Sequence, residues 1–340
     1  MMTEREYCDD YVSNQSEEYE REVPVGNILL RDVDSLPDAG SGSLSCSIDR
    51  LHTPSDIGRE RLVECKKEPT FQALGQLLIY TYLRRRDREL IWDKYNRRDG
   101  GWEAKTDISR FDSHVYKTDK RYHVKPLIEN INQILVIGEV DSSDSLLLST
   151  CLDFGIQVEH RTSGTWRELS AEIFQTKSTD RLRLTSEWLQ TNSRSTLDSS
   201  AEEKLWDNAS DRFEGGRVFK EVPVGSTLYQ DRPESHRADV MVRAKDHWFI
   251  VEVKKSTNES AMTDFQQAFG QATSYANLFA REWGIPSDHV APVVIQDPLA
   301  LLGGVYRQDR YGEDYHTMRD AAFADSSEPF ILGSPQTFAK

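Results

Sequence analysis

The sequence predicts an α/β protein built from two similar halves, and three observations support this. The chain has 340 residues, about twice the commonest domain size. The pentapeptide EVPVG occurs at Glu22–Gly26 and again at Glu221–Gly225. In each half, short apolar segments typical of strands alternate with amphipathic segments typical of helices. We therefore expect two domains of the same mixed type.

The repeat extends well beyond the pentapeptide. The pattern A-[LF]-G-Q-x-x-x-Y occurs at Ala73–Tyr80 and Ala268–Tyr275. Between the two shared strings, each half holds an acidic residue and then an apolar strand that ends in Glu-x-Lys: Asp49 with Glu64–Lys66, and Asp239 with Glu252–Lys254. Because the same features recur in the same order, the sequence indicates an internal duplication.

The repeat and the composition together predict the domain limits. The first domain is expected over residues 1–175 and the second over residues 201–340. Residues 176–200 are rich in Ser and Thr and lack Val and Ile, so they are predicted to be a linker. The first domain is longer because it holds a charged insert near residues 84–125.

Each half has the same expected order of elements. A helix opens it, over residues 201–213 in the second half, and a strand with EVPVG follows. A hairpin comes next, whose second arm ends in Glu-x-Lys, and an amphipathic helix follows it. In the first half a β-α-β unit closes the domain, with a strand over 131–140, a helix over 144–154 and a strand over 156–160.

Composition limits the class of protein. No apolar run approaches the roughly 18 to 20 residues of a membrane span, and the N-terminus has no apolar signal region. We therefore expect a cytoplasmic protein with no membrane partner. The four cysteines form no C-x-x-C pair, which argues against zinc or iron–sulfur motifs and predicts free thiols: Cys8, Cys46, Cys65 and Cys151.

The charge balance does not decide the substrate. The chain has 57 acidic and 42 basic residues, a net charge of −15, and arginine supplies 28 of the basic residues. This acidic, arginine-biased composition resembles that of proteins from salt-loving archaea. At molar salt the Debye length is about 3 Å, so the net charge would not prevent binding of an anionic polymer.

The repeated acidic residues and lysines predict a catalytic site. Residues i and i+2 of a strand share a face, so Glu252 and Lys254 point together. A hairpin turning around Lys245–Asp246 would bring Asp239 beside them. Two carboxylates with open water positions suit Mg²⁺, and a neighbouring ammonium can place a water molecule or stabilise developing charge. The first half offers the equivalent set: Asp49, Glu64 and Lys66.

Further polar residues are candidates for the same clefts. On the helix after each Glu-x-Lys, a Gln and a Tyr lie four residues apart on one face: Gln76 with Tyr80, and Gln271 with Tyr275. Gly75 and Gly270 precede the glutamines and would permit close approach of a strand or of a nucleic acid. Alignment of the EVPVG strings places Glu203 of the second opening helix onto Glu4 of the first, which offers one more carboxylate in each half.

These residues resemble the PD-(D/E)xK nuclease superfamily, and the Q-x-x-x-Y element resembles its RecB-like branch. The resemblance covers about Glu4 to Tyr80 and Glu203 to Tyr275, under half of the chain. It implies two tandem restriction-endonuclease-like domains, each a mixed central sheet flanked by helices, arranged as a pseudo-dimer. Ile48 and Ala238 stand where the family pattern has Pro, and the clustered cysteines of some RecB-type relatives are missing.

The resemblance also implies roles for particular residues. The metal ligands would be Asp49 and Glu64 in the first half and Asp239 and Glu252 in the second, joined by the helical Glu203 and Glu4. Lys66 and Lys254 would assist the water nucleophile, and Mg²⁺ or Mn²⁺ would be the cofactor. Gln76, Tyr80, Gln271 and Tyr275 would be supporting residues.

We therefore expect a Mg²⁺-dependent deoxyribonuclease, an endonuclease with two sites in one chain that is monomeric in solution. Nothing in the sequence distinguishes RNA from DNA as the substrate. The alternative is a nucleic-acid-binding or scaffold protein in which one or both sites are inactive. The insert adds candidate phosphate contacts at Arg84–Arg86 and Arg97–Arg98, and candidate base-stacking residues at Trp92, Tyr95 and Trp102.

Overall fold

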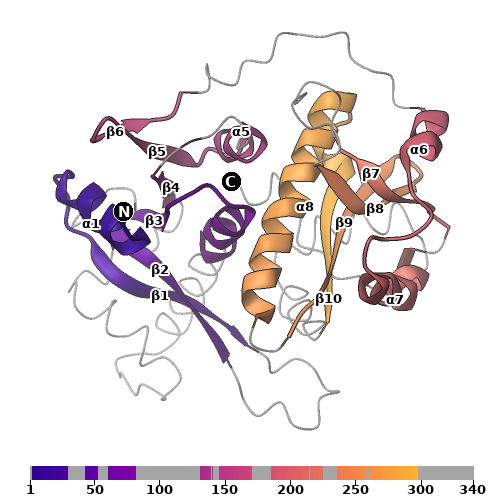
Figure 1. The fold of residues 1–340 in the computed structure, drawn as a ribbon, viewed down its shortest axis with the longest axis horizontal. Coiled ribbons are helices and arrows are strands. Elements are labelled where there is room, and N and C mark those ends of the chain that lie inside the picture. Colours follow the sequence, from indigo (N-terminus) through magenta and orange to yellow (C-terminus); the bar gives the residue numbers. More distant parts are fainter. Residues whose placement is uncertain are drawn as a thin grey trace, which may run out of the picture.

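The structure is a computed structural model that describes residues 2–29, 43–52, 60–81, 131–138, 140, 145–170, 185–213, 215–224, 236–257 and 260–297. It is an α/β protein with two mixed sheets, each flanked by helices (Figure 1). The predicted α/β class is therefore confirmed. One sheet belongs to the first half of the chain and the other to the second half.

The strands of the first sheet lie in the order of the sequence: β1 (Glu20–Leu29), β2 (Ser43–His52), β3 (Glu60–Lys66), β4 (Ile131–Ile137), β5 (Gln157–Thr162) and β6 (Thr165–Glu168). The pairs β1–β2, β2–β3 and β5–β6 are antiparallel, whereas β3–β4 and β4–β5 are parallel. Helix α5 (Ser145–Asp153) connects β4 to β5, so the predicted β-α-β unit is confirmed. Helix α1 (Glu4–Ser13) packs against β3 and β4.

The second sheet repeats the first four strands of that arrangement. It contains β7 (Arg217–Pro223), β8 (Arg237–Ala244), β9 (His247–Lys255) and β10 (Val290–Asp297). The first three strands pair antiparallel, and β10 is parallel to β9. The hairpin between β8 and β9 turns at Lys245–Asp246, as predicted, with Lys245 at a φ of 54°. This half also contains α7 (Ser200–Ala209), the 3-10 helix η3 (Ser210–Phe213), α8 (Ala261–Trp283) and the 3-10 helix η5 (Ser287–His289).

Part of the segment predicted as a linker packs on the second sheet. Helix α6 (Ser186–Asn192) is capped by Thr185 and buries Leu189 in the apolar cluster that contains Phe219 of β7. Thr185 caps α6, and Ser199 caps the next helix, a role that short hydroxyl side chains favour. Residues 185–200 thus belong structurally to the second half.

The prediction of free thiols is wrong for one pair of cysteines. Cys8 of α1 and Cys65 of β3 form a disulfide with an S–S distance of 2.07 Å and a Cα–Cα distance of 5.7 Å. Both are buried in the cluster where α1 packs on the sheet. The two cysteines are 57 residues apart in the sequence, so the pairing depends on the fold and could not be predicted from local spacing. Cys151 is a buried free thiol.

The two halves meet where the helix over residues 71–81 crosses α8 (Figure 1). A Cβ atom added to Gly75 would lie 1.9 Å from the carbonyl oxygen of Gln266, and one added to Gly270 would lie 1.9 Å from that of Phe71. Phe71 and Gln266 occupy equivalent positions of the repeat, so the crossing is nearly symmetric. The two glycines therefore allow close helix–helix packing, and not the predicted approach of a strand or nucleic acid.

Candidate functional site

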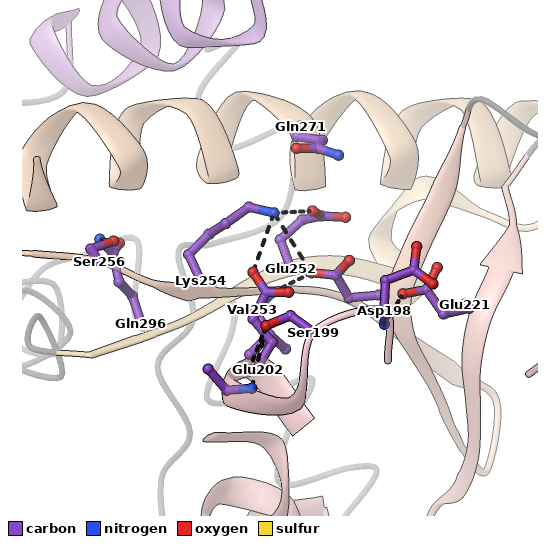
Figure 2. Close-up of polar contacts among 12 residues, drawn as sticks. Asp198, Ser199, Glu202, Glu221, Glu252, Val253, Lys254, Ser256, Gln271 and Gln296 are labelled. Carbon is purple, nitrogen blue, oxygen red and sulfur yellow. Dashed lines mark hydrogen bonds and ion pairs between the residues drawn. The ribbon is translucent and has the colours of Figure 1, made fainter. Parts of the chain in front are cut away.

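In the second half, three carboxylates surround the ammonium group of Lys254 (Figure 2). Its Nζ lies 3.8 Å from Glu252 Oε2 and 4.0 Å from Asp239 Oδ2. It also lies 4.0 Å from Oε1 of Glu202, in the first turn of α7. Strands β8 and β9 and helix α7 therefore converge on one charged group.

The alternation of β9 explains how this site is oriented. Val251 and Val253 pack with Trp206 of α7 in one apolar cluster, whereas Ile250 packs with residues of α8 in another. Glu252 and Lys254 therefore share the face on which α8 lies. Asp239 is held in place because its Oδ2 accepts a hydrogen bond from the Val253 amide at 2.7 Å.

Burial outweighs the positive charge of Lys254 at both Glu252 and Asp239. Glu252 is 0% exposed, and within the described residues neither of its carboxylate oxygens accepts a hydrogen bond. Burial, together with the neighbouring charge of Asp239, raises the pKa of Glu252 well above its usual value. Burial also raises the pKa of Asp239 to about 6. Burial lowers the pKa of Lys254, but Glu252 and Asp239 outweigh that effect and raise it.

The first half contains the same arrangement. Lys66 Nζ lies 2.9 Å from Glu64 Oε1 and 3.8 Å from Oε2 of Glu4 on α1. The Cys65 amide donates to Asp49 Oδ2 at 2.8 Å, which repeats the bond from Val253 to Asp239. Burial, followed by the charge of Asp49, raises the pKa of Glu64 to about 8, and its buried Oε2 accepts no hydrogen bond within the described residues.

The helical carboxylate of the second half is Glu202, where the sequence predicted Glu203. Glu203 points away from the site, because one of its oxygens pairs with Lys220 and the other accepts from the Leu197 amide at 2.7 Å. The second half has one more residue between its opening helix and its EVPVG strand, so the strand alignment shifts the helix by one position. On a helix, one position turns a side chain by about 100°. The sequence reads Ala-Glu-Glu here, so only the packing of Trp206 identifies the correct glutamate.

The Gln and Tyr residues of the repeated Q-x-x-x-Y pattern lie in different surroundings. In each half the Gln amide donates to the Tyr hydroxyl four residues later, at 3.3 Å for Gln76–Tyr80 and 3.0 Å for Gln271–Tyr275. Both tyrosines are buried, and Tyr80 also accepts from Gln266 of α8 at 3.2 Å. Gln271 lies over Lys254 and Glu252 (Figure 2). Gln271 therefore borders the second site, whereas Tyr80 and Tyr275 pack between the helices.

In both sites the carboxylates gather around a lysine. Within the described ranges, the one trio of possible metal ligands with atoms all within 4.8 Å of one another is Cys8, Asp49 and Cys65. The disulfide uses both sulfurs of this trio, so it does not indicate Mg²⁺. The fit to a hard cation rests on other features: oxygen donors, burial, and carboxylate oxygens of Glu64 and Glu252 without hydrogen bonds.

Other predicted contacts lie outside the described residues. This holds for the basic insert over residues 84–125, with its arginine runs and with Trp92, Tyr95 and Trp102. In the described part of the chain, no helix is long and apolar enough to cross a membrane. Comparisons with family models, curated proteins and solved structures gave no significant match.

Proposed function

We propose that the chain is a metal-dependent nuclease made of two tandem restriction-endonuclease-like domains, with DNA as its substrate. The observation that carries this proposal is the repetition of one arrangement. In each half a buried Glu, a Lys two residues later and an Asp on the neighbouring strand converge, and a backbone amide between the Glu and the Lys holds the Asp. In each half, a glutamate on the opening helix also lies within 4.0 Å of that half's lysine.

The residues of the second site divide the work of phosphodiester hydrolysis. Asp239 and Glu252 would hold Mg²⁺ or Mn²⁺, because in the described part of the chain Lys254 is the one cationic side chain that pairs with them. When bound, such an ion supplies a Lewis acid that lowers the pKa of a water molecule and polarises a phosphoryl oxygen. Lys254 orients the attacking water and stabilises negative charge on the phosphate, and Glu202 holds the ammonium on its open side.

The presence of two sites also supports a proposal about how the two strands of a DNA duplex are cut. The crossing of the helix over 71–81 with α8 relates the halves nearly symmetrically, as in a dimer with two equivalent sites. Each site would then cut one strand of a duplex, and the chain would work as a monomer with an internal pseudo-dimer. We expect a cytoplasmic location, where chromosomal or invading DNA is accessible.

One observation favours the alternative role for the first half. Lys66 lies 2.9 Å from Glu64, whereas Lys254 lies 3.8 Å from Glu252. The closer ion pair occupies an oxygen that a cation would need. The first half is therefore the half that would bind or position nucleic acid if one of the two sites does not cut.

The test is cleavage of supercoiled plasmid, linear duplex, single-stranded DNA and RNA by the full chain in Mg²⁺, Mn²⁺ or EDTA. Asp239→Ala and Glu252→Ala should abolish cutting by the second site, and Glu203→Ala, outside the cluster, is the matched control. If each site cuts one strand, Lys66→Ala and Lys254→Ala should each nick the plasmid, and the double variant should be inactive. Cleavage that survives in EDTA would refute the proposal.

A further inference from the structure

A row of three acidic residues runs across three strands of each sheet. The pairs Lys220↔Val240 and Val222↔Ala238 place Glu221 of β7 opposite Asp239 of β8. Continuing the pair Val240↔Val251 by one residue places Asp239 opposite Glu252 of β9. Residues directly opposite each other project from the same face, and like charges in such pairs destabilise a sheet.

The first half contains the same row. The pairs Arg21↔Arg50 and Val23↔Ile48 place Glu22 opposite Asp49, and the pair Arg50↔Val63 continues to Asp49 and Glu64. The outermost glutamate in each row is the first residue of the repeated EVPVG string. The string that revealed the duplication therefore supplies an acidic residue at the equivalent position of each sheet.

Both outer glutamates have a strained backbone. Glu22 has a φ of 48° and Glu221 a φ of 50°, in the left-handed region that costs a residue with a side chain about 1–2 kcal/mol. Within the described residues two other non-glycine residues have positive φ, Ser163 and Lys245, and both lie in hairpin turns. Glu22 and Glu221 instead lie within strands. A glycine would adopt this conformation without strain but would bring no carboxylate.

The Glu221 side chain is held at the edge of the second site. It is 5% exposed, and its Oε1 accepts a hydrogen bond from the Asp198 amide at 3.2 Å. Its Oε2 lies 4.0 Å from Nε of Arg237, whose guanidinium also donates to the Glu221 carbonyl oxygen. Figure 2 shows the carboxylates of Glu221 and Asp198 beside each other, on the side of Glu252 away from Ser256.

We propose that Glu221 is a third carboxylate of the cation-binding group in the second site. The proposal rests on the proposed metal-dependent function and adds a ligand to it. Glu252 supplies the second, independent observation, because it is fully buried in the same row with both oxygens free of hydrogen bonds within the described residues. A divalent cation with oxygen ligands, such as Mg²⁺ or Mn²⁺, neutralises such a row and offsets the backbone strain.

The test is titration of the metal-free full chain with Mn²⁺ by calorimetry, in a Glu64→Gln background so that the second site dominates. Glu221→Gln keeps an oxygen that can accept from the Asp198 amide but removes the charge, and Glu221→Gly removes both the charge and the strain. Both should weaken Mn²⁺ binding at least tenfold. Without metal, the Glu221→Gly variant should have a higher melting temperature than the parent protein. Glu203→Gln is the matched control and should bind as the parent does.

The outcomes separate this inference from the proposed function. If the parent binds no Mn²⁺, the proposed metal-dependent function fails as well. If the parent binds Mn²⁺ and Glu221→Gln binds it equally well, Glu221 is not a ligand, while the proposed function stands. Loss of the fold in both variants, judged by circular dichroism, would show that Glu221 has a structural role and would overturn the inference.

Discussion

Breaking the Cys8–Cys65 disulfide should destabilise the first half of the chain and loosen its site. The disulfide joins α1, which carries Glu4, to β3, which carries Glu64 and Lys66. An isolated helix of 10 residues is marginal in water, so α1 depends on its attachments to the sheet. Its other attachments are the buried Tyr11 and polar contacts such as that of Asp10 with Trp166.

The magnitude follows from the length of the loop. The disulfide closes a loop between residues separated by 57 positions. In the chain-entropy treatment, opening a loop of this length gives the unfolded chain freedom worth about 4 kcal/mol at 25 °C. The free energy of unfolding should therefore fall by about that amount on reduction. The second half has Trp206 and Val253 at the equivalent positions, so it should not respond to reductant.

The assay is denaturant unfolding of the full chain with and without a reductant, followed by circular dichroism and tryptophan fluorescence. The Cys8→Ala/Cys65→Ala variant should resemble the reduced protein and show no response to reductant. Cys151→Ala, which alters a buried free thiol, should keep the full response. If the peptides with Cys8 and Cys65 are alkylated in the denatured, unreduced protein, or if reduction leaves unfolding unchanged, the reasoning is refuted.

Three further predictions concern the interface, the pH dependence and salt. Gly75→Ala and Gly270→Ala each put a Cβ 1.9 Å from a backbone oxygen, so both should lower the melting temperature by similar amounts. The pKa of Glu64 is raised from 4.5 to about 8, so the native state retains a proton that the unfolded state loses. In EDTA, its contribution should therefore reduce stability as the pH rises from about 4.5 to 8, and Glu64→Gln should remove this slope in thermal melts. With a net charge of −15, the melting temperature and cleavage rate should rise toward molar NaCl, and an optimum near 0.1 M would contradict this.

The local patterns of the sequence predicted the elements that depend on neighbouring residues. The hairpin at Lys245–Asp246 follows from two apolar arms of matching length, and the β-α-β unit from an apolar strand, a helix and a second strand. The convergence of Asp239, Glu252 and Lys254 follows from the same hairpin register. These features require only the two-residue period of strands and the closing of a turn.

Features that depend on packing between distant elements were not predictable in this way. The choice of Glu202 over Glu203 depends on how α7 rotates to bury Trp206. The Cys8–Cys65 disulfide requires α1 to pack on β3. Local sequence patterns do not predict this contact between distant elements. The positive φ of Glu221 is likewise not visible in the sequence, where EVPVG indicated only that the two halves are related.

The glycine crossing couples the two candidate sites through short segments of chain. Lys66 precedes the helix over residues 71–81 by a few residues, and Lys254 similarly precedes α8. Because Gly75 and Gly270 bring the backbones of these helices into direct contact, neither helix can shift without displacing the other. We therefore expect that a displacement of either helix would also shift the helix of the other half, and with it the segment that leads back to that half's lysine.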